Sequence, residues 1–204
     1  MKIDTEHLHY WMCAIRESSD PLRTMDAFWS GQLKSKEWLI KSLSYWIDDV
    51  VSVEIHGGWV GTLASLMFQS DIGPSYKSIR SIDIDPTCES IATMMNKKEE
   101  MAGRFRAVTS DMCTIRSDAD VIINTSCEHI TQDDYDLWLS GLPNNSLLVL
   151  QSNNYNIPEH VRTASSLEEF KKQCGINILW SGQLELPLYT RYMIIGKQSC
   201  LKEF

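Results

Sequence analysis

The sequence lacks the segments that direct a chain to or through a membrane. Its start, MKIDTEHLHY, contains no apolar core of a signal peptide. No stretch approaches the ~18 consecutive apolar residues that a membrane-spanning helix needs. We therefore expect a cytoplasmic protein that makes no contact with a membrane.

Positive charge is also scarce. Lys and Arg together number 19 against 27 Asp and Glu, which gives a formal net charge of −8 and a pI near 5.1. Nonspecific binding of nucleic acid depends on a basic surface that displaces counterions, so this composition argues against it. A local basic groove around Arg104 and Arg106 stays compatible with the composition.

The cysteines lack the spacing of a metal site or a disulfide framework. The chain has six and no CxxC pair, so reduced thiols are the simplest interpretation. We expect no zinc site and no other metal. The six are Cys13, Cys88, Cys113, Cys127, Cys174 and Cys200.

The chain has no repeat, low-complexity tract or recognisable linker, so we expect one domain over residues 1–204. From residue 50 onward, strand-like and helical segments alternate, which is typical of crossover units around a mostly parallel sheet. The strand-like segments are 50–55, 78–84, 105–109, 119–124 and 146–151, and the helical ones are about 60–69, 87–100, 131–140 and 166–173. Two last strand-like segments, 176–182 and 190–197, are joined too closely for a helical crossover and predict an antiparallel hairpin at one edge. The expected fold over residues 50–197 is therefore α/β, a doubly wound, Rossmann-like sheet of about seven strands with an antiparallel last strand.

Residues 1–48 are expected to form a helical cap over the strand ends. Helices are predicted over 5–17 and 35–47, the second with Ser35 as its N-cap. Tryptophans at helical spacing usually pack in a core, so we favour packing for Trp29, Trp38 and Trp46. The polar residues between them in FWSGQLKSKEWL leave a second interpretation open, in which this segment covers a ligand.

A glycine-rich turn in VSVEIHGGWVGTLA follows the first strand of the alternating region. Strand, tight turn and helix start present backbone N–H groups to a nucleotide-like ligand. Read as GxGxxG, the turn has His56 at the first glycine position, and Asp83 follows Gly61 by 22 residues, as a dinucleotide-binding fold requires. Glu54 opposes this interpretation, because a carboxylate at the strand end would face the dinucleotide phosphates.

A second interpretation uses Glu54. Residues 50–197 resemble class I S-adenosylmethionine (SAM)-dependent methyltransferases, which carry an acid two residues before a glycine-rich turn and a second acid at the end of the next strand. SIDIDPTCESIA resembles their second-strand segment, RFRAVTSDM their third strand, and ADVIINTSCEHI their fourth strand and its loop. LPNNSLLVLQSNN resembles the turn into their fifth strand, and the terminal hairpin fits as well. The chain is also similar to uncharacterised small methyltransferase-like proteins encoded by tailed phages, for which the host cytoplasm would be the location.

The resemblance implies a set of cofactor-binding residues. Glu54 would lie near the methionine amino group, Asp83 would bind both ribose hydroxyls, and Asp111 would accept a hydrogen bond from the adenine amino group. The other candidates are His56, Gly57, Gly58, Gly61 and Asn124. For each there is a structural alternative: a solvated strand-end acid at Glu54, a helix or turn cap at Asp111, and plain turn formation at the glycines.

The turn departs from the family pattern. His56 and Val60 stand where two glycines would, and Gly61 comes one position late. No NPPY-type motif follows Asn124, which weakens the case for methylation of a base amino group.

His129 is the candidate general base, because an imidazole in the loop over the cofactor could deprotonate a hydroxyl or amine, with Glu128 orienting it. A hydrogen-bonding histidine at a helix start is the alternative. His160, Arg162 and Arg191 lie where family members build substrate pockets, and we favour surface positions for them.

The predicted function is SAM binding with methyl transfer to an unidentified acceptor, a small molecule or protein in preference to nucleic acid, with a specific RNA or nucleotide kept open. Aminocarboxypropyl transfer from SAM and a non-catalytic SAM-binding module are the alternatives. An NAD-binding oxidoreductase ranks below them.

Overall fold

The computed structural model describes residues 4–72 and 75–199, so Cys200 lies outside the described residues. The chain divides into two compact units, the N-terminal unit (residues 1–112) and the C-terminal unit (residues 113–204). The expectation of one domain stays a prediction. The five described cysteines are free thiols, as expected.

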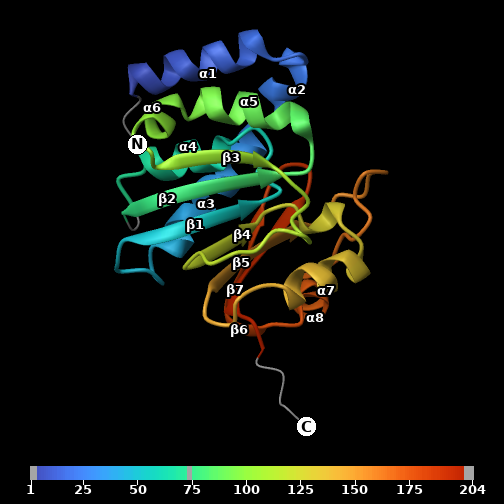
Figure 1. Cartoon of the computed structure of the whole chain (residues 1–204). Coiled ribbons are helices and arrows are strands. Elements are labelled where there is room, and N and C mark those ends of the chain that lie inside the picture. Colours follow the sequence, from blue (N-terminus) through green and yellow to red (C-terminus); the bar gives the residue numbers. More distant parts are fainter. Residues whose placement is uncertain (1–3, 73–74, 200–204) are drawn as a thin grey trace. The chain divides into compact units, whose positions relative to one another are not determined.

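The N-terminal unit contains three parallel strands in the order β3-β2-β1 (Figure 1). They are β1 (Val51–His56), β2 (Tyr76–Asp83) and β3 (Phe105–Thr109). Helix α4 (Thr62–Gln69) connects β1 to β2, and helices α5 (Pro86–Met95) and α6 (Lys97–Met101) connect β2 to β3. These parallel crossovers place the carboxyl ends of neighbouring strands, and the loops that follow them, at one edge of the sheet.

The single helix predicted over 87–100 is wrong, because the chain breaks at Asn96 into α5 and α6. The Asn96 side chain is buried and its Nδ2 donates to the carbonyl oxygens of Gly61 and Ala92, at 3.0 and 2.9 Å. An asparagine that bonds backbone in this way competes with regular helix geometry. The break therefore fixes the start of α4 against α5.

Three helices precede β1, where the sequence predicted two: α1 (Thr5–Glu17), α2 (Pro21–Asp26) and α3 (Ser30–Leu43). Helix α1 packs on α5 (Figure 1). The Trp11 indole donates to Ser65 Oγ of α4 at 2.8 Å. The expected cap over the strand ends stays a prediction. The prediction of Ser35 as an N-cap is wrong. Ser35 is buried inside α3, whose N-cap residue is Trp29.

The expected core packing fails for two of the three tryptophans. Trp29 is 68% exposed and its indole donates to Asp26 Oδ1, and Trp46 is also exposed, while Trp38 is half-buried. Leu39 and Leu43 supply the buried side of α3 instead. The sequence spacing could not tell the buried side of α3 from its exposed side, because tryptophan and leucine both fit an apolar stripe.

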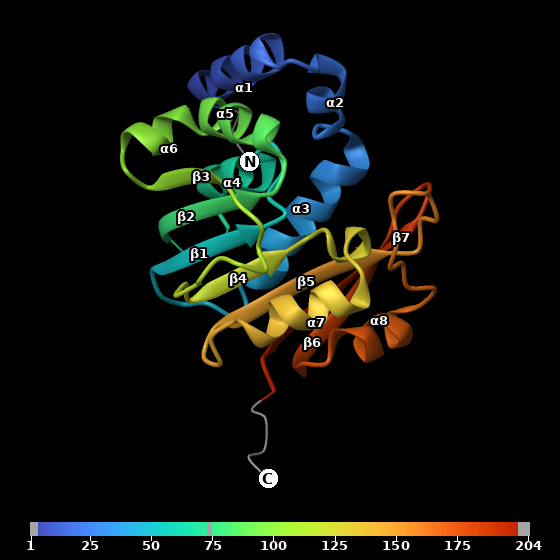
Figure 2. The same cartoon turned by 45° about the vertical axis from the view of Figure 1, so that its right-hand side comes forward.

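The C-terminal unit contains four strands in the order β4-β5-β7-β6. They are β4 (Val121–Asn124), β5 (Leu147–Asn153), β6 (Asn177–Glu185) and β7 (Thr190–Lys197). Strand β5 is parallel to β4, and β7 is antiparallel to both β5 and β6, which confirms the terminal hairpin. A short 3₁₀ helix, η1 (Cys127–His129), follows β4, and α7 (Gln132–Ser140) and α8 (Leu167–Cys174) lie next to each other (Figure 2).

The predicted fold class is confirmed. Seven strands form a mixed α/β sheet in which β7 is the antiparallel member, inside the edge strand β6. Over residues 4–72 and 75–199, no helix combines the length and the apolar composition that crossing a bilayer requires.

Candidate functional site

The glycine turn between β1 and α4 lies against the end of β2. Gly57 and Gly61 have left-handed backbone conformations, with φ of +69° and +77°. The Gly58 N–H donates to the Ile82 carbonyl oxygen at 2.9 Å, and the Gly61 N–H donates to the Gly58 carbonyl oxygen at 3.0 Å. Glycine is the residue that adopts positive φ without steric cost, so the turn depends on its glycines.

Gly58 is required for close approach rather than for its φ. A Cβ built on it would lie 2.0 Å from Ser81 Oγ and 3.2 Å from Ser81 Cβ. Gly61 is also constrained by packing, because its Cβ would lie 2.7 Å from Asn96 Nδ2 and 2.9 Å from Ala92 Cβ. These contacts explain why Gly61 is a glycine: the start of α4 packs closely on α5 at this residue.

We expect Gly58→Ala to lower the free energy of unfolding by about 1–3 kcal/mol, the usual cost of overpacking a tight contact. Replacing Ser81 by alanine in the same chain removes the clashing hydroxyl and should recover part of the loss. Gly141→Ala is the matched control, since its Cβ would meet no atom nearer than 3.5 Å. Urea unfolding of the four variants checks this, and strict additivity of the Gly58 and Ser81 changes would refute the clash.

Asp83 closes the turn from the end of β2. Its Oδ2 accepts the Trp59 N–H at 2.7 Å and its Oδ1 accepts the Asp85 N–H at 3.0 Å. Trp59 adopts a φ of +49°, which is uncommon for a residue with a side chain and marks a backbone held by its surroundings. Each carboxylate oxygen has two acceptor positions, so one on each oxygen is left for a ligand. Asp83 is partly exposed, which makes those positions reachable.

Glu54 has protein partners for both of its oxygens. The side chain is buried within β1, where Arg80 of β2 pairs with Oε1 and the fully buried His56 contacts Oε2 through Nε2 at 3.1 Å. Arg80 stands opposite Glu54 in the β1–β2 register. This geometry gives Glu54 and His56 a role in joining the two strands, and contact of either residue with a methionine group stays a prediction.

Two further residues border the strand ends of this unit. Asp111 follows β3 by two residues and is exposed. Ile84, directly after Asp83, is 70% exposed. The sequence pattern predicted no role for Ile84, because it lies outside the apolar periodicity of β2 and α5.

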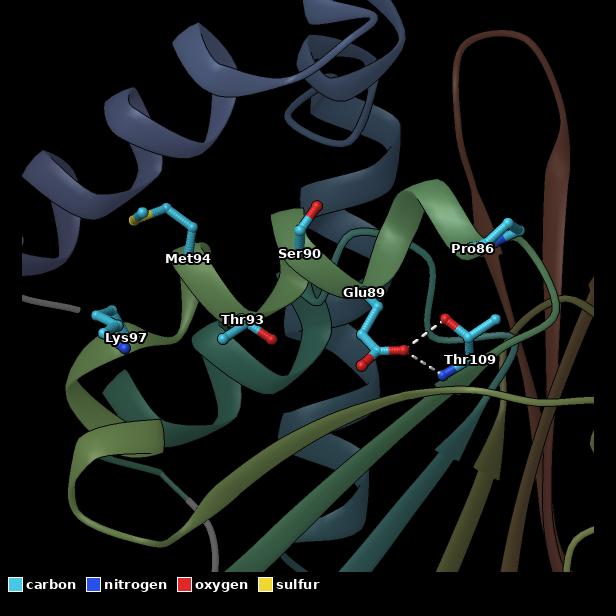
Figure 3. A pocket seen from close by; sticks show the side chains of 7 residues that line it. All are labelled: Pro86, Glu89, Ser90, Thr93, Met94, Lys97 and Thr109. Atoms are coloured by element: carbon cyan, nitrogen blue, oxygen red, sulfur yellow. Dashed lines mark hydrogen bonds between the residues drawn. The ribbon is translucent and has the colours of Figure 1, made fainter.

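A surface pocket of about 570 Å³ lies along α5 and not at the glycine turn (Figure 3). Glu89 and Thr109 stand at its edge, and Glu89 Oε2 already accepts the Thr109 N–H at 2.8 Å and the Thr109 hydroxyl. These hydrogen bonds lower the pKa of Glu89. The Glu89 carboxylate therefore ties α5 to β3.

In the C-terminal unit, Asn124 ends β4 and is buried. Its Oδ1 accepts the Ser126 N–H at 2.9 Å, which shapes the turn into η1. A role of Asn124 in cofactor binding stays a prediction.

Glu128 forms a buried ion pair with Arg191, and the orientation of His129 by Glu128 stays a prediction. Arg191 Nη1 and Asn153 Nδ2 both donate to Glu128 Oε1 at 2.6 Å. Arg191 also donates to the Thr125 carbonyl oxygen. The expected surface position of Arg191 is therefore wrong, because its charge is compensated inside the unit.

Arg162 is also buried, against expectation. Its guanidinium lies 4.0 Å from the centre of the Tyr135 ring and donates to the Cys127 carbonyl oxygen at 3.3 Å and Gln132 Oε1 at 3.0 Å. A cation stacked on an aromatic ring and hydrogen-bonded in this way is stabilised in place. Arg162 is thus a structural residue of the loop between β5 and α8.

The His129 and His160 rings pack edge to face, with ring centres 4.6 Å apart and planes at 87°. His129 Nδ1 lies 3.2 Å from the Glu159 carbonyl oxygen, and His160 Nδ1 lies 2.6 Å from the Tyr155 carbonyl oxygen. Desolvation lowers the pKa of His129 below its usual 6.5, which favours the neutral imidazole at pH 7. Cys127 offers no nucleophile beside it, because burial raises its pKa to about 12.

No protein-family model matches the chain, and no curated protein matches it in sequence. Solved structures do match. Magnesium protoporphyrin IX methyltransferase (ChlM) from Synechocystis PCC 6803, solved with bound SAH, aligns with 96% of this chain and 95% of its own at 14% identity and a TM-score of 0.63. N-methyltransferase NodS from Bradyrhizobium japonicum WM9 was solved in complex with S-adenosyl-L-homocysteine (SAH). The alignment covers 92% of this chain and 98% of NodS, at 14% identity and a TM-score of 0.64. MtNAS in complex with MTA and tNA aligns over 96% and 71% at 12% identity and a TM-score of 0.58. The chain shares the fold of these proteins.

Proposed function

We propose that this chain binds SAM and transfers its methyl group to a small-molecule acceptor. The observation that carries the proposal is the glycine turn closed by Asp83, with the Trp59 N–H on the carboxylate at 2.7 Å. The fold adds support, because ChlM and NodS were solved with SAH.

The residues at the turn fit a nucleoside. The remaining acceptor positions of Asp83 suit two vicinal hydroxyls, which are hydrogen-bond donors. The exposed side chain of Ile84 offers an apolar surface next to them, which suits a flat base. Gly57 and Gly58 carry no side chain that would keep a ligand from the backbone.

The same residues would also fit the adenosine half of NAD. The argument that Glu54 repels the dinucleotide phosphates is weaker in the structure than in the sequence, because Arg80 compensates its charge. The preference for SAM therefore rests on the fold shared with ChlM and NodS, and NAD belongs in every binding test.

SAM supplies a methyl group that is already activated by its positive sulfur, so the protein's task is to hold the acceptor in line and exclude water. His129 is the proposed proton acceptor in the metal-free chain. The Glu159 carbonyl oxygen can only accept, so Nδ1 carries the proton and Nε2 presents its lone pair. The acceptor's proton would move to His129 Nε2 while the acceptor's lone pair forms the bond to the methyl carbon. The bond from that carbon to the sulfur would break, and SAH would leave.

The proposed acceptor class follows from the net charge of the chain and from the names of similar solved structures. A chain with a net charge of −8 is poorly suited to bulk nucleic acid. ChlM is named for a porphyrin. Another similar solved structure, mitomycin 7-O-methyltransferase MmcR, is named for mitomycin. Both are small molecules. A small-molecule acceptor is therefore favoured over protein or RNA.

A second candidate function, transfer of the aminocarboxypropyl group, is supported by the likeness to MtNAS solved with MTA and tNA. It would use the same nucleoside site. A non-catalytic SAM-binding module would use it as well, and only the products separate the three.

We expect the chain, incubated with methyl-labelled SAM and a fractionated cell extract, to release SAH and to label the small-molecule fraction. Mass spectrometry of the released nucleoside identifies the reaction. Methylthioadenosine in place of SAH would overturn methyl transfer in favour of the second candidate, and label in protein or RNA would overturn the acceptor class. Asp83→Ala, which lacks the proposed ribose contact, is the control for background turnover.

A further inference from the structure

Glu128, His129 and His160 form a cluster of possible metal ligands in the C-terminal unit. One ligand atom from each residue lies within 4.8 Å of the other two. Glu128 and His129 come from η1, and His160 comes from the loop after β5. Two imidazoles and one carboxylate are an accepted ligand set for a divalent transition metal.

The two histidines have the backbone hydrogen bonds that support ligating histidines. The Tyr155 and Glu159 carbonyl oxygens can only accept hydrogen bonds, so both Nδ1 atoms carry the proton. Each Nε2 is therefore the atom with the lone pair. A backbone carbonyl on the far nitrogen is the usual support that fixes the tautomer of a ligating histidine.

The buried carboxylate of Glu128 also indicates a cation site, independently of the histidines. Its side chain is buried, and Oε1 receives both Arg191 and Asn153, but Oε2 has no hydrogen-bond partner among the described residues. A buried carboxylate oxygen without a partner costs free energy and is rare in folded proteins. A cation at the cluster would give Oε2 the partner that it lacks.

We propose that Glu128, His129 and His160 bind one divalent transition-metal ion of the zinc class. Ligand atoms in a tetrahedral site with bonds of about 2.0–2.1 Å lie about 3.4 Å apart. Rotation of the two imidazoles, which lie near the surface, would close the gap from 4.8 Å. Three protein ligands leave a position open for water or substrate, as in catalytic zinc sites.

The ligand set discriminates among metals. Mg²⁺ and Ca²⁺ prefer oxygen ligands, whereas this cluster offers two nitrogens and a single carboxylate. Arg191 already compensates part of the Glu128 charge, which further weakens attraction for a hard cation. The site should therefore select zinc-like ions in the presence of excess Mg²⁺.

The use of the open position rests on the proposed function, whereas binding of the ion does not. A hydroxyl oxygen of the acceptor bound there would lose its proton to water more easily, because a cation lowers the pKa of a ligated hydroxyl. The oxygen lone pair would then form the bond to the methyl carbon as the carbon–sulfur bond breaks and SAH leaves. His129 would act as a ligand in this state, since a ligated Nε2 has no lone pair for a proton.

The test is a titration of chelator-treated protein with ZnCl₂, against a chromophoric competitor, in excess Mg²⁺ and without SAM. We expect one equivalent to bind, and His160→Gln to weaken binding by at least about 100-fold, the upper end of losses for outer-shell partners. Titration with CoCl₂ should give visible bands that His160→Gln abolishes. His9→Gln is the matched control, because His9 Nε2 lies 3.7 Å from Cys13 Sγ and is another exposed histidine beside a possible ligand.

Absence of stoichiometric binding, or equal affinity in wild type and His160→Gln, would overturn the metal site. Loss of binding in His9→Gln in place of His160→Gln would assign the ion to α1 and overturn it too. Because SAM is absent from this titration, failure here leaves the proposed function standing.

Discussion

Replacing Asp83 by alanine is expected to weaken SAM binding by roughly 30- to 1,000-fold, or about 2–4 kcal/mol. The substitution removes a charged acceptor for both ribose hydroxyls and leaves the Trp59 N–H without its partner at 2.7 Å. Calorimetry of wild type and variant measures the loss. Asp83→Asn keeps one acceptor oxygen and the side-chain shape, so its SAM affinity should lie between those of wild type and Asp83→Ala.

Asp85→Ala is the matched control, because it removes a carboxylate two residues away that has different partners. Asp85 caps α5 through the Thr87 N–H at 2.9 Å and pairs with Arg23 at 2.7 Å. The Thr87 hydrogen bonds and Arg23 lower the pKa of Asp85 to about 2. Loss of an N-cap should cost about 1 kcal/mol of stability and leave SAM affinity nearly unchanged. Equal losses of affinity from the two alanines would refute the assignment of Asp83.

Arg191→Met is expected to lower the free energy of unfolding by about 3–5 kcal/mol. The methionine fills similar volume but leaves the Glu128 carboxylate buried, with Asn153 Nδ2 still donating to it at 2.6 Å. An uncompensated buried charge costs more than the pair contributes, so Glu128→Gln in the Arg191→Met chain should recover part of the loss. Urea unfolding of wild type and of both variants measures these changes.

The control for this prediction is an exposed pair on α8. Lys171 and Glu168 lie 2.7 Å apart three residues along the helix, and Glu168 is largely exposed. Lys171→Met should cost less than about 1 kcal/mol, as surface pairs do. A cost for Arg191→Met as small as that for Lys171→Met would mean that Glu128 takes up a proton or finds water when Arg191 is removed.

The parts of the molecule that sequence predicted well are set by local pattern. The strands from β1 to β7 lie within a few residues of their predicted ranges, because apolar runs between turn residues identify strands in a parallel sheet. The approach of the glycine turn to Asp83 was also predictable, since neighbouring parallel strands end at the same edge. Here the structure adds the Trp59 N–H, which no sequence pattern indicates.

The parts that sequence missed depend on distant partners. Arg191 was expected at the surface because arginine is mostly exposed, and its partner Glu128 lies 63 residues away. His129 and His160 are likewise 31 residues apart, so no sequence spacing predicted that their rings would lie side by side. The expectation of no metal stays a prediction. The Asn96 break has the same origin, because the Gly61 carbonyl that binds it belongs to another helix connection.

The measurement that tests the central claim most directly is calorimetry of the wild-type chain with SAM, SAH and NAD. We predict that SAM and SAH bind at one site per chain and that NAD binds at least about 100-fold more weakly. The expected difference follows from the fold that the chain shares with ChlM and NodS, both of which were solved with SAH. Tight binding of NAD, or no binding of SAM and SAH by folded protein, would contradict the account.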